Sequence, residues 1–187
     1  MDLFAGAESG YSVFEHREYR KRNRDMRGIE GIVDQLHRSL EGDSWQGASI
    51  REILEGITAK EAAVHPVPGG HSIWELVYHL TAWVNAVHLR VLGKVSELDG
   101  EADWPPVRDM SENAWAAAFE NLRRSQSGLI ATLKTLSDVD LNAPVPNRDY
   151  DCAHLLHGLT QHHAYHAGQM LLLKRILQHQ AKESTSL

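Results

Sequence analysis

The last long segment of the chain restricts the fold most strongly, because it has the pattern of one uninterrupted amphipathic helix with histidines in its apolar stripe. Residues 152–178 contain no proline, and leucines recur there at the three- and four-residue spacing of a helix face. His162 and His166 lie in the same stripe, one helical turn apart. A helix of this length and pattern favours a bundle of packed helices.

Three further long segments have helical apolar periodicity, and each begins or ends at a recognisable signal. They cover about residues 28–41, 73–92 and 112–135. Ser72 and Glu75 form a capping box that predicts the start of the second helix. The polar linker between the second and third helices has about 17 residues and, fully extended, reaches about 58 Å, whereas a 20-residue helix is about 30 Å long. The linker is therefore long enough to let these two helices run parallel.

The sequence thus predicts an all-α protein, a four-helix bundle with a long crossover between helices 2 and 3. The chain shows no strand pattern and no internal repeat. We expect an N-terminal extension over residues 1–25, one bundle domain over residues 26–180 and a frayed C-terminal tail over residues 181–187.

Composition excludes several classes of protein. The 19 Lys and Arg against 25 Asp and Glu give a formal charge of −6, which does not favour nucleic-acid binding. No apolar run approaches the roughly 20 residues of a membrane-spanning helix, and the N-terminus lacks the pattern of a signal peptide. The single cysteine excludes an internal disulfide and fits a reducing compartment. We therefore expect a cytoplasmic protein without a nucleic-acid or membrane partner.

Histidines on two of the predicted helices suggest a metal site. His79 lies on the inward face of the second helix, between Leu76 and Trp83, and the pair His162 and His166 lies on the inward face of the last helix. Buried imidazoles need partners, and a shared divalent cation is one such partner. The alternative is that these are core histidines, satisfied by hydrogen bonds to the backbone or to side chains.

A metal held by three histidines keeps at least one coordination position open, as catalytic zinc sites do. Such a position accepts water, or a substrate thiolate or oxygen, so a thiol transferase and a hydrolase-like enzyme both fit. Imidazole ligands suit zinc, nickel, copper and ferrous iron equally well. A metallopeptidase is excluded, because His163 stands where the His-Glu-x-x-His motif needs its catalytic glutamate.

Two stretches of this chain resemble the DinB/YfiT-like superfamily of bacterial metal-binding four-helix bundles. They are His71-Ser-Ile-Trp-Glu-Leu-Val-Tyr-His79 and Gly158-Leu-Thr-Gln-His-His-Ala-Tyr-His-Ala-Gly-Gln169, and the resemblance covers roughly residues 28–178. It implies that His79, His162 and His166 together bind a divalent metal, with zinc or nickel expected and iron compatible. Two positions depart from the usual pattern: Ala167 replaces a common arginine, and His163 replaces a small or acidic residue.

The resemblance also implies an activity class. Some members activate a low-molecular-weight thiol for transfer to a small electrophile or for isomerisation, and a homodimer is expected from the same resemblance. The competing hypotheses are a non-catalytic metal-binding or stress-response module, in which the metal joins helices 2 and 4, and a helical interaction protein whose core histidines bind no metal. The fold alone does not decide among them.

Five other residues are candidates for the surroundings of the metal. Glu75, one turn before His79, has a carboxylate suited to accept the second N–H of that imidazole, and Tyr165 has a hydroxyl suited to donate to a metal-bound group. Gln169, one turn beyond His166, is suited to orient that ligand or to bond a facing backbone group. The tryptophans expected to line a pocket are those in predicted loops, Trp45 and Trp104.

Overall fold

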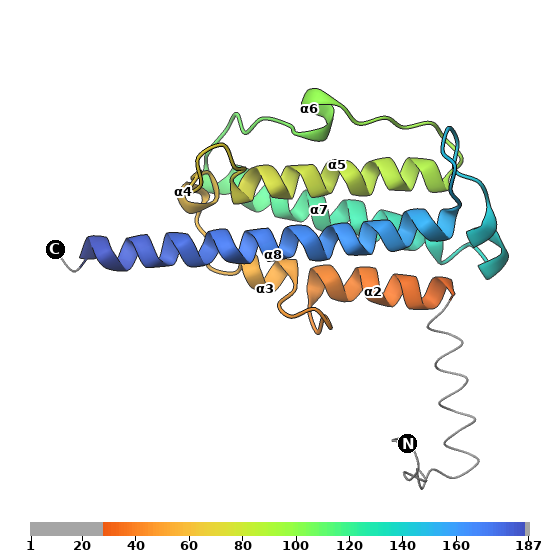
Figure 1. Cartoon of the computed structure of the whole chain (residues 1–187), viewed down its shortest axis with the longest axis horizontal. Helices are drawn as coiled ribbons and strands as arrows, with labels where there is room; N and C mark the ends of the chain where they lie inside the picture. The colour runs from red at the N-terminus through yellow and green to blue at the C-terminus, as the bar shows by residue number, and fades with distance from the viewer. Residues whose placement is uncertain (1–27, 186–187) are drawn as a thin grey trace, which may run out of the picture.

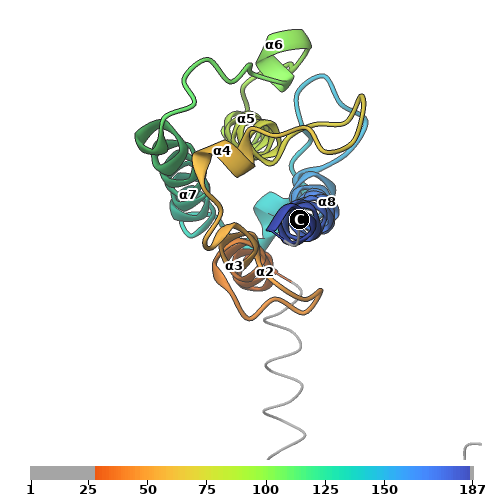
Figure 2. The same cartoon turned by 90° about the vertical axis from the view of Figure 1, so that its left-hand side faces the viewer.

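The computed structural model describes residues 28–185, and within this range the only β-type pairing is one isolated bridge between Pro144 and Asp151. The expectation of an all-α fold is confirmed. Four long helices pack side by side (Figures 1 and 2). They are α2 (Ile29–Glu41), α5 (Ile73–Val91), α7 (Glu112–Leu133) and α8 (Cys152–Thr185). The predicted extension over residues 1–25 lies outside the described residues.

The crossover between α5 and α7 runs back along the bundle, as the length of the linker predicted. Figure 1 shows that α5 and α7 start at the same end, whereas α2 and α8 start at the opposite end. The connecting segment carries a short helix, α6 (Gly100–Asp103), which lies over α5. This arrangement matters for the site described below, because it brings Asp103 and Trp104 of the linker against His79 of α5.

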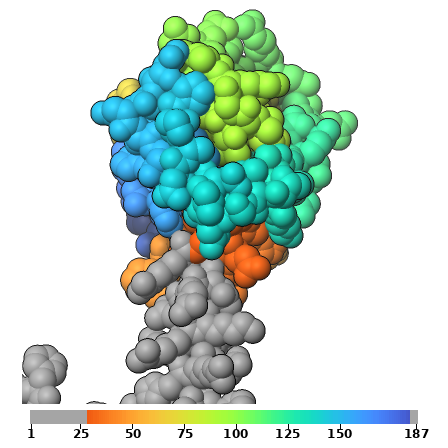
Figure 3. Space-filling model, turned by 90° about the vertical axis from the view of Figure 1, so that its right-hand side faces the viewer, coloured from red at the N-terminus to blue at the C-terminus, as the bar shows by residue number. Residues whose placement is uncertain are grey.

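Short helices complete the ends of the bundle. Between α2 and α5 lie α3 (Ile50–Leu54) and α4 (Ala59–Ala62), and both begin at capping boxes, as does α5. The segment between α7 and α8 holds a 3₁₀ helix, η1 (Asp138–Asn142), and covers the end of the bundle seen in Figure 3. The side chain of Asp138 accepts a hydrogen bond from the backbone N of Ile29 at 2.9 Å, which ties η1 to the start of α2.

The prediction of a frayed tail from residue 181 onward is wrong for residues 181–185. The sequence placed the end of the last helix near Gln178, but α8 continues to Thr185. Residues 178–183 contain good helix formers and neither proline nor glycine, so no signal ends the helix there. Within the described residues, no helix combines the length and the apolar character needed to cross a membrane.

The core is built from the inward faces of all four long helices, with one buried polar network at its centre. Fully buried leucines come from each helix, namely Leu36, Leu80, Leu122 and Leu156. The network joins α2, α7 and α8. Ser39 Oγ donates to the carbonyl of Leu36 at 2.8 Å, Gln126 Nε2 donates to the same carbonyl at 2.7 Å, and His163 Nδ1 lies 3.1 Å from Ser39 Oγ.

His163 is therefore a core residue. The sequence placed it at the edge of the apolar stripe, whereas its side chain is completely buried, at 0% exposure. Because the hydroxyl proton of Ser39 goes to Leu36, the Nδ1–H of His163 is the donor in their hydrogen bond. Burial lowers the pKa of His163 from 6.5 to about 4, and the neighbouring His166 acts in the same direction.

This burial predicts an acid-sensitive stability. Between pH 6.5 and about 4 the unfolded chain binds a proton at His163 that the folded protein does not, so the free energy of unfolding falls as the pH decreases through this window. The loss attributable to this one group is about 3 kcal/mol by pH 4. We expect His163→Gln, whose amide can still donate to Ser39, to show a shallower decrease in urea-unfolding free energy between pH 7 and pH 4.5. Equal slopes for both proteins would contradict the assignment.

Candidate metal centre

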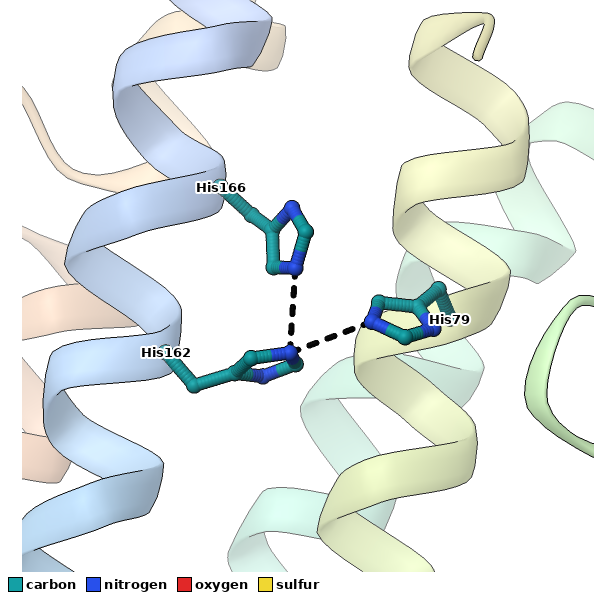
Figure 4. Close-up of side chains that lie close together, drawn as sticks. All are labelled: His79, His162 and His166. Atoms are coloured by element: carbon teal, nitrogen blue, oxygen red, sulfur yellow. Dashed lines mark hydrogen bonds between the residues drawn. The ribbon is translucent and has the colours of Figure 1, made fainter. Parts of the chain in front are cut away.

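Three imidazoles meet in the space between α5 and α8 (Figure 4). His79 projects from α5, while His162 and His166 project from successive turns of α8, and all three rings point toward one another. The Nε2 atom of His162 lies 3.1 Å from Nε2 of His79 and 3.0 Å from Nε2 of His166. The three ligand atoms lie within 4.8 Å of one another, and this is the only such group found among the described residues.

The tautomer of His79 is fixed by Asp103, a residue of α6. His79 Nδ1 lies 3.0 Å from the backbone carbonyl oxygen of Asp103 and 2.9 Å from its carboxylate Oδ1. Both oxygens only accept hydrogen bonds, so Nδ1 carries the proton and Nε2 presents a lone pair to the cluster. The same carboxylate oxygen accepts a hydrogen bond from Trp83 Nε1 at 2.8 Å, which holds it in place.

The tautomer of His166 is fixed in the same way by Gln169. His166 Nδ1 lies 2.7 Å from Gln169 Oε1, one turn further along α8. The amide oxygen accepts the Nδ1–H, so Nε2 of His166 also presents a lone pair to the cluster. The sequence-based role for Gln169, orienting a ligand, matches this placement.

Burial keeps the three imidazoles neutral. It lowers the pKa of His162 from 6.5 to about 3, with the neighbouring histidines acting in the same direction. Burial is also the main reason that the pKa values of His79 and His166 are lowered, against the opposing effects of Asp103 and Gln169 respectively. A neutral imidazole nitrogen is the form that binds a metal ion.

The donor set fits a divalent cation. The inward nitrogens of His79 and His166 have no proton to give, so at most one N–H, that of His162, is available among three converging nitrogens. A cation relieves this shortage of donors. Ligands about 2.05 Å from a tetrahedral zinc ion lie about 3.3 Å from one another. The two separations that involve His162 are 3.0 and 3.1 Å, and all three nitrogens lie within 4.8 Å of one another. Imidazoles suit zinc, nickel, copper or ferrous iron, so the ligands do not select the metal.

Trp104, one of the two predicted pocket tryptophans, packs against the histidine cluster but is not among the described residues that line the pocket beside it. Its ring is stacked between the rings of His71 and His79, with centroids 3.5 and 3.9 Å away and interplanar angles of 5° and 8°. It also makes a T-shaped contact with the His166 ring, with centroids 6.3 Å apart. The stacked indole therefore helps to hold the plane of the His79 ring.

The remaining candidates lie elsewhere. Trp45 is 99% exposed, in the loop after α2, so it lines no pocket and that expectation is corrected. Glu75 does not bond His79; its carboxylate accepts from the backbone N of Ser72 at 2.9 Å and lies 2.9 Å from His65 Nε2. The capping box holds this carboxylate at the start of α5, out of reach of the next turn. Tyr165 is exposed, and its ring packs against the edge of His166.

Sequence reasoning missed Asp103 and Trp83 as parts of this site. Asp103 directly precedes Trp104, but the sequence singled out only the tryptophan and assigned Asp103 to the linker. An acidic residue next to a loop tryptophan is a weak signal, since its contact with His79 crosses 24 residues of chain. Trp83 was placed on the inward face of its helix, but its hydrogen bond to Asp103 depends on where the crossover lies.

Loss of the Asp103 carboxylate should weaken metal binding. Partners of this kind orient a ligand and raise its basicity, and their removal typically lowers metal affinity about 10- to 100-fold. We expect Asp103→Ala to lower zinc affinity within this range and Asp103→Asn, which keeps an oxygen acceptor, to lower it less. Competition titration with a chromophoric chelator measures both.

Asp109→Ala is the matched control for this prediction. Asp109 lies on the same linker, but its carboxylate accepts from the backbone N of Ser111 at 2.9 Å, so the control should keep wild-type affinity. Wild-type affinity in Asp103→Ala as well would contradict the orienting role of Asp103.

Comparison with known proteins agrees with this geometry. The family model described as the DinB superfamily matches residues 44–170, which include all three histidines of the cluster. No curated protein matches the chain, and no solved structure matches it either. The match extends over more than half of the chain and over α3 to α8 up to Met170, so the family is established by sequence and supported by the all-helical fold. The chain belongs to the DinB superfamily.

Proposed function

We propose that this protein is a divalent-metal-dependent enzyme that transfers a low-molecular-weight thiol to a small electrophile. The observation that carries the proposal is the convergence of three neutral imidazole nitrogens, two of them fixed as lone-pair donors by Asp103 and Gln169. Three nitrogen ligands leave a coordination position for a substrate, as catalytic sites require. Zinc or nickel is the proposed metal, and iron is compatible with the same ligands.

A bound divalent cation would lower the pKa of a coordinating thiol, so that the thiolate is present at neutral pH. In the transfer the sulfur attacks the electrophilic carbon, an S–C bond forms, and the bond from that carbon to its leaving group breaks. The thiol proton passes to solvent when the thiolate forms, and the leaving group takes up a proton from solvent, so no oxidant or reductant is needed. The protein contributes orientation: His79, His162 and His166 hold the ion, while Asp103 and Gln169 hold two of the rings.

A non-catalytic metal module is the second candidate, and one observation favours it. The ligands come from both α5 and α8, so a bound ion would join two helices of the core and stabilise the fold. A cytoplasmic location and a homodimer also belong to the proposal. The first rests on the reducing compartment that a single cysteine suits, and the second rests on the family resemblance.

Metal content is the direct test of the site. We expect about one divalent ion per chain in the untagged protein by mass spectrometry, by analogy with single-ion three-histidine sites. His79→Ala, His162→Ala and His166→Ala should each lose it while keeping most of the helical circular dichroism. His157→Ala is the matched control, because His157 is an exposed histidine of the same helix and should keep the ion. If the wild-type protein binds neither zinc nor nickel when loaded with them, the proposal of a metal-dependent enzyme is contradicted.

Thiol binding separates the enzyme from the module. If the open position accepts a thiol, 2-mercaptoethanol added to the cobalt(II)-loaded protein should produce a sulfur-to-cobalt charge-transfer band that saturates. The module predicts no such band, although removal of the metal would still lower the melting temperature. A stabilising metal without thiol binding would therefore decide for the second candidate.

A further inference from the structure

A small apolar pocket adjoins the metal centre, between α5 and α8. Its volume is about 210 Å³, and His162 belongs both to its lining and to the histidine cluster. Val87, Leu155 and Leu159 are buried residues and form its apolar floor. The described residues that line the pocket include no Lys, Arg, Asp or Glu. Its polar side chains are those of Tyr150, His154 and His162, and the rest of its lining is mainly apolar, so the pocket suits an uncharged occupant that is mostly apolar.

Trp83 gives the pocket a rigid aromatic wall next to the metal ligands. Its ring lies 5.3 Å from the ring of His162, centroid to centroid. Two contacts hold the indole. Its Nε1 donates a hydrogen bond to Asp103 at 2.8 Å, and the guanidinium of Arg90 lies over the ring, 5.5 Å from its centroid. A flat wall held in this way is suited to pack against a ring or a branched aliphatic group.

The His162 ring, which lines the pocket, has one buried nitrogen without a partner in the described part of the chain. Nδ1 of His162 is buried and has no hydrogen-bond partner among the described residues, whereas Nδ1 of His79 and of His166 bond Asp103 and Gln169. When Nε2 of His162 binds a metal, its Nδ1 carries the proton and becomes a donor. Ligating histidines almost always donate this second N–H. The protein supplies an acceptor for this second nitrogen in His79 and His166. Its described residues supply none in His162, the ring that lines the pocket.

We infer that this pocket binds the body of the thiol substrate, an uncharged apolar group about the size of one aromatic ring. The reacting group then lies at the open metal position. This inference rests on the proposed function and specifies its substrate class. The volume of about 210 Å³ is below the roughly 300 to 1,000 Å³ of pockets for drug-sized ligands, so large substrates are excluded.

Gly158 offers a way to close the pocket without disturbing the metal. It lines the pocket and is exposed, and a Cβ added there would meet no atom within 4 Å. Gly168 is also an exposed glycine of α8 with nothing within 4 Å of an added Cβ, but it does not line the pocket. Gly158→Leu and Gly168→Leu are therefore matched substitutions, and both remove a helix-interior glycine, which favours folding.

The experiment compares two thiols on the cobalt(II)-loaded protein, benzyl mercaptan and 2-mercaptoethanol, by absorbance titration. Burial of a phenyl group should make benzyl mercaptan bind about tenfold or more tightly than 2-mercaptoethanol in the wild type. Gly158→Leu should remove this preference, leave the affinity for 2-mercaptoethanol within about twofold, and keep the cobalt content. Gly168→Leu should keep the wild-type preference.

The possible outcomes distinguish failure of the pocket inference from failure of the proposed thiol-transfer function. If both thiols bind but the wild type shows no preference, or if Gly158→Leu keeps the preference, the pocket does not hold the substrate body and the inference is overturned. In that case metal-dependent thiol chemistry stands. If neither thiol binds the cobalt protein, the proposed function fails and the inference fails with it.

Discussion

The metal centre depends on hydrogen bonds that fix which nitrogen of each imidazole faces inward. Asp103 and Gln169 accept the Nδ1 protons of His79 and His166, so the inward nitrogens of these rings are lone-pair donors. Burial keeps the rings neutral, since it lowers all three pKa values. Three nitrogens within 4.8 Å of one another, with too few protons among them, form a site that a divalent cation satisfies.

The crossover between α5 and α7 links the topology of the bundle to this chemistry. Because the linker returns along α5, α6 lies over that helix and places Asp103 and Trp104 against His79. The same carboxylate also fixes Trp83, which forms a wall of the apolar pocket beside His162. One linker residue thus connects ring orientation at the metal with the shape of the proposed substrate pocket.

His162 and His163 are adjacent in α8, but helix geometry directs them to different parts of the structure. Consecutive residues are rotated by about 100° around a helix axis. His162 therefore faces α5 and the metal cluster, while His163 faces α2 and bonds Ser39 in the core. His163 thus belongs to a buried polar network in the interior of the bundle, with Ser39, Gln126 and the carbonyl of Leu36.

The sequence was enough to predict the all-α class, the start of each long helix and the parallel course of α5 and α7. It also predicted that His79, His162 and His166 lie together. These follow from apolar periodicity, capping boxes and linker length, which are local properties of the chain. Only the tertiary structure shows that Asp103 is the partner of His79 and that Trp104 lies at the site while Trp45 is exposed. Glu75 is instead held away from His79 by the capping box of α5, which is a local feature of the sequence. The contacts of Asp103 and Trp104 and the exposure of Trp45 depend on where a loop lies in space. The path of a loop is set by packing between distant segments, which no periodicity in the sequence encodes.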